Sequence, residues 1–332
     1  MAARRKSSTN AAPNNNSVSP NVALLQKLLE HAISFPVWHG QFRHARAAPL
    51  KDESTKTAFC WILKNSCTQF LSLFCRMKSL HENSSQKAEA YLSQHGIDHF
   101  GWRFCFYELN YLHSRRDDRI FSDSRWTKLA VIRHPFDRFL SGFKHKCIHY
   151  KQFCFDCQQN LECFAQRNLQ FIQNQSRSPR ELTYPGDRSE HTAHFFPQSW
   201  FCDFRHHLKD YTLIRYEKSS AYREAIRTEF RKLGWPSEII DSGWGPDLEQ
   251  PFLSVTTAHS DEKANRSSTD FDQIFHRNLR IIDTVFRTYI NDFIAFNFRL
   301  PRTVKLLCDQ VPENLKRSCL ICDFTEILAE DF

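Results

Sequence analysis

The sequence is poor in glycine and methionine and has no long hydrophobic run. Its 332 residues include only 8 Gly and 2 Met. No stretch approaches the roughly 20 uninterrupted apolar residues of a membrane span. The chain begins Met-Ala-Ala-Arg-Arg-Lys, but polar residues follow where a signal peptide has its apolar core. No anchor or signal peptide is therefore visible, whereas 30 Phe predict a core filled with aromatic rings.

The charge of the chain favours polyanionic partners. A hydrophobic content of 41%, with 25% charged residues, is typical of a globular protein. The net charge of +8 favours nucleic acid, phosphorylated cofactors, acidic glycans or anionic lipid as partners. Because the basic residues are scattered and no nucleic-acid-binding module is recognisable, we expect no nucleic-acid partner. A non-catalytic protein that binds polyanions or nucleic acid is the alternative class.

Twelve cysteines are many for a cytosolic enzyme of this size. N-glycosylation tripeptides begin at Asn15, Asn83, Asn174 and Asn265, which agrees with a secretory route although such tripeptides also occur by chance. The missing signal peptide conflicts with that route. The sequence leaves the conflict open.

Five cysteines cluster between residues 147 and 202. Cys154 and Cys157 form a C-x2-C pair, which is a common zinc half-site. The second pair of a zinc module is missing, so we favour disulfides over zinc and leave their pairing open. The cluster consists of Cys147, Cys154, Cys157, Cys163 and Cys202.

Composition divides the chain into four segments. Residues 1–20 are rich in Ser, Asn and Pro and are expected to be disordered. Residues 21–55 contain an amphipathic helix and a linker, and we favour packing of this helix on the domain over binding at a membrane surface. Residues 56–300 form the predicted single domain, and residues 301–332 a cysteine-containing tail.

A first strand–loop–helix unit is predicted early in the domain. Residues 57–63 are an apolar run typical of a strand, and residues 69–80 have helical periodicity. The loop between them reads Lys64-Asn-Ser-Cys-Thr68. Its backbone N–H groups, the Thr68 hydroxyl and the Lys64 ammonium could bind a phosphate, although the Walker A pattern is absent. A helix N-cap at Ser66 or Thr68 is the simpler interpretation and is compatible with phosphate binding.

A second such unit follows at residues 129–143. Leu-Ala-Val-Ile is typical of a buried strand, and Pro135 suits the first turn of a helix. The Phe and Leu residues of 136–143 fall on one helical face. Arg133 at the end of the strand and Ser141 on the helix then suggest an anion site, against the alternative of an ordinary βα unit with a surface arginine.

The two units together resemble the carbohydrate sulfotransferases of the chondroitin/dermatan type. Those enzymes use 3′-phosphoadenosine-5′-phosphosulfate (PAPS), whose 5′ end is held by Lys-x-x-Cys/Ser-Thr and whose 3′-phosphate is held by Arg-His/Asp-Pro-x-x-Arg-x-x-Ser. The resemblance implies a P-loop-like α/β three-layer sandwich with a central, mainly parallel sheet. It also implies an acidic glycan acceptor and a location in the Golgi lumen or membrane. The residues expected to bind PAPS are Lys64, Asn65, Ser66, Cys67, Thr68, Arg133, Arg138 and Ser141.

Two later segments extend this resemblance to about residues 56–298. His194-Phe-Phe-Pro-Gln-Ser-Trp-Phe-Cys202 is similar to a His-x-x-Pro-Gln…Cys block of the family, and Tyr289-Ile-Asn-Asp-Phe293 to its Tyr-x-x-Asp-Phe ending. The chain departs from the family at Asn65-Ser66, where relatives often have Gly. It departs again in its tail cysteines and in showing no membrane anchor, so membrane association is expected from the family alone.

Sulfuryl transfer requires a base and a cation at the departing phosphate oxygen, and it needs no metal. We assign the cation to Lys64 and the base to His194, with His191 as the second candidate. The acceptor sugar and hydroxyl are left open. A kinase-like P-loop enzyme and a pseudoenzyme with the same fold are further alternatives.

Overall fold

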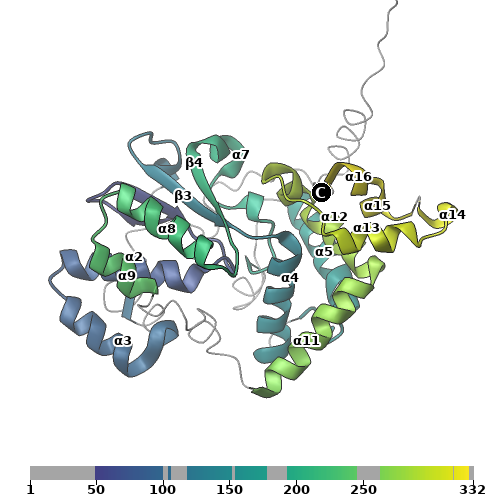
Figure 1. Cartoon of the computed structure of the whole chain (residues 1–332), viewed down its shortest axis with the longest axis horizontal. Helices are drawn as coiled ribbons and strands as arrows, with labels where there is room; N and C mark the ends of the chain where they lie inside the picture. Colours follow the sequence, from purple (N-terminus) through teal and green to yellow (C-terminus); the bar gives the residue numbers. More distant parts are fainter. Residues whose placement is uncertain are drawn as a thin grey trace, which may run out of the picture.

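The chain forms an α/β domain around a central four-stranded sheet (Figure 1). The structure, a computed structural model, describes residues 49–99, 104–105, 118–151, 154–177, 193–244, 262–316 and 318–328. The predicted disordered segment 1–20 and the amphipathic helix lie outside the described residues. His191 lies outside them as well.

Three of the four strands are parallel, as expected for an α/β sheet with helical crossovers. The strands run in the order β1-β2-β3-β4, and only β1 is antiparallel to its neighbour. In the pairing, Cys60 lies opposite Ala130, and Ile132 lies opposite Arg215. The carboxyl ends of β2, β3 and β4 therefore meet at one edge of the sheet. The strands are β1 (Leu50–Asp52), β2 (Thr57–Cys60), β3 (Thr127–Ile132) and β4 (Tyr211–Arg215).

The two apolar runs predicted as strands correspond to β2 and β3, and the predicted mainly parallel α/β fold is confirmed. β2 ends at Cys60, so residues 61–63 lead into the loop instead of extending the strand. β1 was not predicted, because it lies in the segment assigned to a linker. Its three residues are too few to show an alternating pattern.

The longer helices supply the layers that pack on the sheet and on one another. In Figure 1, α2, α3, α8 and α9 lie together on the left, and α4, α5, α11 and α12 on the right. They are α2 (Cys67–His81), α3 (Ser85–His99), α4 (Pro135–Phe143), α5 (Leu161–Arg177), α8 (Ser220–Lys232), α9 (Ser237–Trp244), α11 (Glu262–Arg277) and α12 (Leu279–Ala295).

Short helical segments connect these layers and form the tail. A π-helical stretch, η4, directly follows α4. The short segments are η3 (Asp118–Phe121), η4 (Lys144–His149), η5 (Gln198–Trp200), α7 (Phe204–His207), η6 (Leu208–Asp210), α13 (Arg302–Asp309), α14 (Glu313–Lys316), α15 (Leu320–Asp323) and α16 (Thr325–Leu328).

Both faces of the sheet are covered, since successive side chains of a strand point to opposite faces. From β2, Phe59 stacks on Phe70 of α2 with ring centroids 3.8 Å apart. Its neighbour Ala58 belongs to a separate buried cluster with Ile120 and Trp126. All four residues of β2 are buried, as a central strand of a covered sheet requires.

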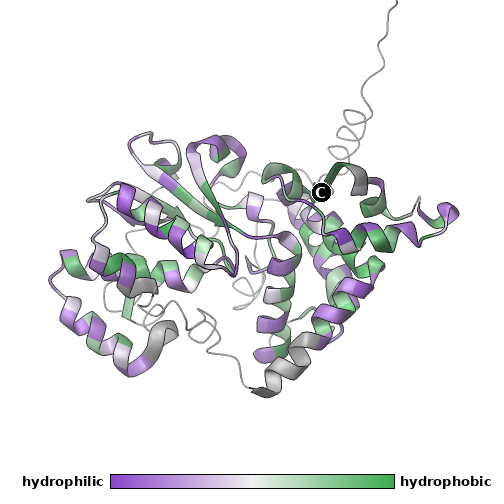
Figure 2. Ribbon diagram, in the orientation of Figure 1, coloured by the Kyte–Doolittle hydropathy of each residue, from purple (hydrophilic) through white to green (hydrophobic). Residues whose placement is uncertain are grey.

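The second helical layer is packed by phenylalanines, as the composition predicts. From α4, Phe136 and Phe139 contact Phe275 of α11, and Phe143 contacts Phe271 on the same helix. Figure 2 shows hydrophilic and hydrophobic residues alternating along α11, as expected for a helix with one buried face. α4 is thus held along its length by the carboxyl-terminal half of α11.

Disulfides pair all five cysteines of the cluster, one of them with Cys60. The bonds are Cys147–Cys154, Cys157–Cys163 and Cys60–Cys202, and Cys75–Cys105 and Cys308–Cys322 are two more. The preference for disulfides over zinc in this cluster is confirmed. Cys67 and Cys319 are not in disulfides. Within the described part of the chain, no helix is both long and apolar enough to span a bilayer.

Candidate functional site

Three segments meet at the sheet edge formed by the carboxyl ends of β2, β3 and β4. The loop of residues 64–68 follows β2, Arg133 follows β3, and Tyr216 follows β4. The Tyr216 N–H donates to the carbonyl of Ile132 at 2.7 Å, which extends the pairing of β3 and β4 by one residue. This edge is where open α/β sheets bind their ligands. Both predicted anion loops therefore lie at the same end of the domain.

The backbone of the 64–68 loop is held in an uncommon conformation. Lys64 has φ 71° and Ser66 has φ 59°, both in the left-handed region that glycine adopts more easily. Such residues cost on the order of 1 kcal/mol each and persist where the surrounding structure fixes them. Alternation of left-handed and other conformations turns successive N–H groups toward a common point, which favours an anion. The loop thus reaches this conformation without the glycine of its relatives.

The helices that start at the two anion loops have no side-chain cap. Ser66 is the N-cap residue of α2, yet its hydroxyl makes no capping bond and accepts from the Tyr222 hydroxyl at 3.1 Å. His134 at the start of α4 likewise provides no cap. In contrast, Ser219 caps α8 with a bond from the N–H of Tyr222. Since first-turn N–H groups have no acceptor within their own helix, those of α2 and α4 suit a bound anion. A simple capping role for Ser66 is not what the structure shows.

Arg133 joins the two loops directly. Its Nη1 donates to the carbonyl of Lys64 at 3.0 Å, and its guanidinium lies 4.6 Å from the ring centre of Tyr216. Burial lowers the pKa of Arg133, although an arginine stays charged at neutral pH. Among the described residues, no carboxylate forms an ion pair with it, and its buried Nε makes no hydrogen bond. A largely buried positive charge with an unused donor fits an anionic ligand.

Gln198 connects both loops through its side-chain amide and is completely buried. Its Oε1 accepts from the backbone N–H of Arg133 at 2.9 Å, and its Nε2 donates to the Arg133 carbonyl at 2.7 Å. The same Oε1 accepts from Asn65 Nδ2 at 2.6 Å. Asn65 also donates to the carbonyl of Val131 at 2.7 Å. One side chain therefore fixes the first loop against the end of β3.

The Gln198 segment is itself held by α12. Asp292 accepts from the backbone N–H groups of Gln198 and Ser199, at 2.7 and 2.8 Å. The Tyr289 hydroxyl donates to the carbonyl of Phe195 at 2.9 Å. Burial raises the pKa of the Asp292 carboxyl and of the Tyr289 hydroxyl. The Tyr-x-x-Asp-Phe pattern of residues 289–293 thus has a structural role, since its Tyr and Asp side chains orient the segment that contains His194 and Gln198.

Two residues predicted to bind PAPS are buried and already hydrogen-bonded within the protein. Arg138 is 1% exposed, and it donates to the carbonyls of Leu63 at 3.0 Å and Phe196 at 2.7 Å. Burial lowers the pKa of Arg138 as well. Asn65 is also 1% exposed. Their contacts favour holding the loop in place, and direct binding of the donor by either side chain stays a prediction.

The other residues predicted to bind PAPS are half-buried. Thr68 and Cys67 lie in the first turn of α2, where the Cys67 carbonyl accepts from Trp61 Nε1 at 2.8 Å. Ser141 lies on α4, six residues and about 9 Å along the helix axis from Pro135, with which the helix begins. Within the described residues, no hydrogen bond joins Ser141 to the first loop. An anion shared by Arg133 and Ser141 would have to lie between them.

His194 is buried and faces a second histidine. Its ring centre lies 5.7 Å from that of His145 in η4. The neighbouring Phe195 packs against Gly142 of α4 so closely that a Cβ there would lie 2.7 Å from Phe195 Cε1. α4 therefore carries Ser141 and also supports the segment that contains His194. π-helical turns such as η4 often occur at functional sites.

Sequence reasoning missed three residues of this site: Gln198, Asp292 and His145. Gln198 and Asp292 stood in the quoted motifs but without a role, because their partners are distant in sequence. His145 could have been noticed in the run Lys-His-Lys-Cys-Ile-His directly after the Arg-x7-Ser helix.

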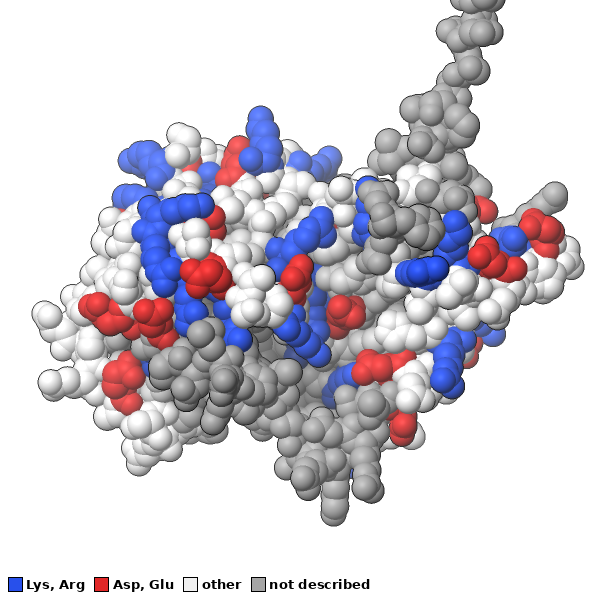
Figure 3. All heavy atoms as spheres, viewed as in Figure 1, with Lys and Arg blue, Asp and Glu red and all other residues white. Residues whose placement is uncertain are grey.

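The face with these loops carries many positive charges. Figure 3 shows Lys and Arg side chains gathered over α8 and in the region between α8 and α4, with acidic side chains among them. On α8, Arg231 pairs with Glu224 at 2.9 Å, and Arg227 lies 3.4 Å from Asp241. These pairs reduce the positive charge only in part.

Comparisons with known proteins show to which family the chain belongs. The family model of the sulfotransferase family matches residues 50–299, and the chain belongs to this family. A carbohydrate sulfotransferase of Caenorhabditis elegans, chst-1, is 26% identical over 211 residues, which cover 59% of this chain and 60% of that protein. An uncharacterized protein of the same organism is 28% identical over 186 residues, covering 53% of this chain and 48% of the relative. The chain thus spans about half to three fifths of these relatives. No solved structure matches it.

Proposed function

We propose that this protein is a carbohydrate sulfotransferase that uses PAPS as its sulfuryl donor. One observation carries the proposal. Two helices without side-chain caps, α2 and α4, begin at the same sheet edge, and Arg133 joins their loops because its Nη1 donates to the Lys64 carbonyl at 3.0 Å. Two anion sites at one sheet edge suit a nucleotide with phosphates at both ends. The family match supports the reaction class, and the relative named a carbohydrate sulfotransferase supports the acceptor class.

Each anion site is assigned to one end of the donor. The loop of residues 64–68 and the start of α2 receive the 5′-phosphosulfate. Arg133 and Ser141 receive the 3′-phosphate, where the unused Arg133 Nε supplies a buried donor. The buried, uncapped and positively charged surroundings fit a dianionic group at each end.

The proposed chemistry is an in-line attack of a sugar hydroxyl on sulfur. His194 takes the hydroxyl proton, and a base near neutral pKa typically contributes roughly 10²–10⁴-fold. Lys64 stabilises the charge that develops on the departing phosphate oxygen. His191 is the second candidate for the base and falls outside the described residues.

The acceptor is proposed to be an acidic glycan of the chondroitin type. The net charge of +8 and the basic surface between α8 and α4 support an acidic acceptor (Figure 3). Five disulfides support an oxidising compartment, and we place the enzyme in the Golgi. Membrane association belongs to the same proposal.

Two assays test the proposed function. In a thermal-shift assay, 3′-phosphoadenosine-5′-phosphate should raise Tm, whereas ATP at the same concentration should not. Radiolabelled sulfate should then pass from PAPS to members of a panel of desulfated glycans. Stabilisation by ATP alone would indicate a kinase-like enzyme, and nucleotide binding without transfer to any glycan a pseudoenzyme. Binding to the glycans without any nucleotide effect would indicate a polyanion-binding protein.

A further inference from the structure

We propose that Gln198 is a positioning residue that sets the spacing between the two anion loops and thereby makes them act as one nucleotide site. The proposal rests on the proposed function and extends it to a residue with no contact to the reacting atoms. Gln198 bonds Arg133 at both its N–H and its carbonyl, and bonds Asn65 of the other loop.

The orientation of the Gln198 amide is fixed by its backbone partners. A backbone N–H can only donate and a carbonyl can only accept, so Oε1 must face the Arg133 N–H and Nε2 the Arg133 carbonyl. Oε1 is then the acceptor that Asn65 Nδ2 requires. The two N–H bonds to Asp292 fix the backbone of Gln198. The side chain has one orientation that satisfies all of these groups.

Such a bridge matters most for a ligand that uses both loops at once. When one end of the nucleotide is bound to its loop, the other end is at a high effective concentration near the second loop. This holds only if the distance between the loops matches the length of the nucleotide. Loosening that spacing should weaken a two-ended nucleotide strongly. It should leave the intrinsic affinity of each loop for a one-ended nucleotide nearly unchanged.

The test compares three nucleotides by isothermal titration calorimetry on the full chain. They are 3′-phosphoadenosine-5′-phosphate, adenosine 5′-phosphate and adenosine 3′-phosphate. In Gln198→Asn, which shortens the amide by one methylene, affinity for the bisphosphate should fall about tenfold or more, and for each monophosphate less than about threefold. Gln166→Asn on α5 is the matched control, because the one side-chain hydrogen bond of Gln166 within the described part of the chain goes to Glu162, one turn away on the same helix. It should bind all three nucleotides as the wild type does.

Gln198→Met, which keeps the length but removes the hydrogen bonds, is the second variant. An equal loss for all three nucleotides, or no loss for the bisphosphate, would overturn the positioning role. Failure of both variants to fold would make Gln198 a requirement of the fold and would also overturn it. Wild-type protein that binds none of the three nucleotides would refute the proposed function itself, which is a different outcome.

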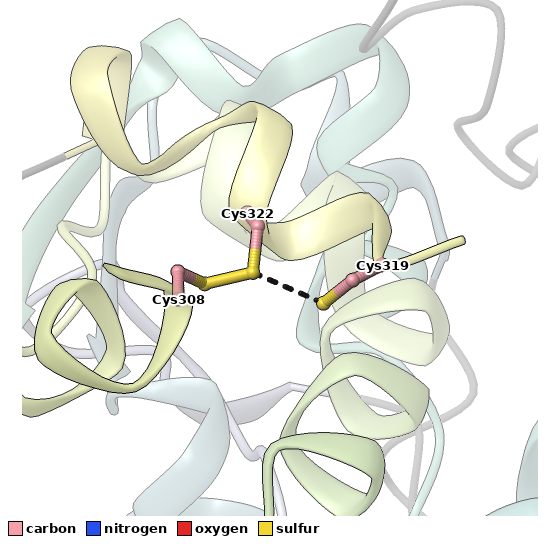
Figure 4. A group of neighbouring side chains, drawn as sticks. All are labelled: Cys308, Cys319 and Cys322. Carbon is pink, nitrogen blue, oxygen red and sulfur yellow. Dashed lines mark hydrogen bonds between the residues drawn. A yellow bond between two sulfur atoms is a disulfide. The ribbon is translucent and has the colours of Figure 1, made fainter. Parts of the chain in front are cut away.

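A separate observation concerns the three sulfur atoms of the tail. Those of Cys308, Cys319 and Cys322 all lie within 4.8 Å of one another, and Cys308 and Cys322 are joined in a disulfide. The Cys319 Sγ lies 3.1 Å from the Cys322 Sγ. Figure 4 shows the Cys322 sulfur between the other two, bonded to that of Cys308 and in contact with that of Cys319. We infer that the tail exchanges between two disulfide isomers.

The exchange balances without an external oxidant. The Cys319 thiol gives its proton to solvent, and its sulfur attacks Cys322 Sγ. The new Cys319–Cys322 bond forms as the Cys308–Cys322 bond breaks, and the electron pair leaves on Cys308, which takes up a proton. The link between α13, which carries Cys308, and α15 is then lost.

The rate of this exchange should rise with pH. Burial raises the pKa of the Cys319 thiol to about 11, with Asp283 and Asp323 adding to the shift and Arg287 opposing it. Between pH 7 and 9 the thiolate fraction, and hence the rate, should increase about tenfold per pH unit. Purified full chain is incubated at each pH, alkylated after acid quenching and mapped by peptide mass spectrometry.

Label should move from Cys319 to Cys308 with time, whereas the control Cys319→Ser should never be labelled at Cys308. Persistent labelling of Cys319 alone at pH 9 would overturn the exchange. Slow labelling of Cys308 in the Cys319→Ser control would overturn it too, since the bond would then open without the third sulfur.

Discussion

Arg133 lies where the local sequence predicts it, directly after a buried strand and close to the start of a helix. The end of a buried strand places it at the sheet edge, and Pro135 starts the next helix two residues later. Its guanidinium bonds the Lys64 carbonyl and stacks on Tyr216, so the side chain is already oriented before any ligand binds. This preorganisation reduces the entropy lost on binding an anion.

Replacement of Arg133 by alanine should therefore weaken donor binding. A charge-assisted hydrogen bond contributes about 1.5–3 kcal/mol, so the KM for PAPS should rise roughly 10- to 100-fold. Arg125→Ala is the control, since Arg125 is 79% exposed and pairs only with Asp123 nearby. Unchanged PAPS affinity in the Arg133 variant would remove this residue from the site.

Asp292→Asn tests how the Gln198 segment is held. Asp292 accepts hydrogen bonds from two backbone N–H groups, whereas the asparagine amide would turn its own N–H toward one of them. The lost bond should lower the free energy of unfolding by about 1–3 kcal/mol. Burial raises the pKa of Asp292 above its ordinary 3.8, so the folded state binds this proton more tightly than the unfolded state does. The contribution of Asp292 to stability is thus greatest below pH 3.8 and falls as pH rises toward the folded-state pKa.

The substitution should consequently destabilise the protein more at acid pH than at neutral pH. Urea unfolding of the wild type and the variant at each pH from 3.5 upward measures this difference, because the other titrating groups are common to both proteins. A loss that grows with rising pH would show that the Asp292 pKa is shifted in the opposite direction.

At the scale of elements, α4 carries more than the predicted anion site. Its phenylalanines pack on α11, Ser141 lies on its half-buried side, and Gly142 receives the ring of Phe195. The Phe195 carbonyl is in turn bonded by Tyr289 of α12. α4 and α12 thus hold the segment containing His194 from two directions, which links helix packing to the position of the proposed base.

Gly142→Ala should disturb this arrangement. The added Cβ would lie 2.7 Å from Phe195 Cε1, and the ring is only 2% exposed, so it has little room to move. We expect a loss of about 1–3 kcal/mol in unfolding free energy, and a lower kcat as the neighbouring His194 shifts. Thermal unfolding and sulfate transfer measure the two effects. In a double-mutant cycle, Phe195→Leu should lessen the cost of Gly142→Ala; additive effects would contradict the proposed clash.

At the scale of the whole molecule, disulfides join segments that the sheet and helices bring together. Cys60–Cys202 links the end of β2 to the chain after Gln198, across 142 residues. The bond lies just before the 64–68 loop on one side and just after the Gln198 segment on the other. It therefore restrains the same two parts of the chain that Gln198 bridges through hydrogen bonds.

Removing Cys60–Cys202 with paired alanines should cost more than removing Cys157–Cys163. In the chain-entropy account the stabilisation grows with the logarithm of the enclosed loop, and the separations are 142 and 6 residues. The difference in unfolding free energy should be about 2–3 kcal/mol, somewhat less because the other disulfides already shorten the larger loop. Denaturant unfolding of the two double variants provides the comparison. Equal losses would mean that loop length does not determine the effect here.

The sequence by itself determined the local units of this protein. Runs of apolar residues identified β2 and β3, and helical periodicity identified α2 and α4. Each pattern depends on neighbours within a few turns, so propensity and periodicity suffice. The position of Arg133 at the end of a strand follows from the same local rules, whereas the mainly parallel sheet was expected from the resemblance to the family.

Only the tertiary structure decided which distant residues meet. Asn65 and Gln198 are 133 residues apart and Gln198 and Asp292 are 94 apart, and no local pattern relates them. The cysteine cluster allowed several pairings, and packing selected one. Long-range contacts depend on how complete layers pack around the aromatic core. The spacing of the two anion loops is therefore a property of the fold, although each loop can be recognised from its own residues.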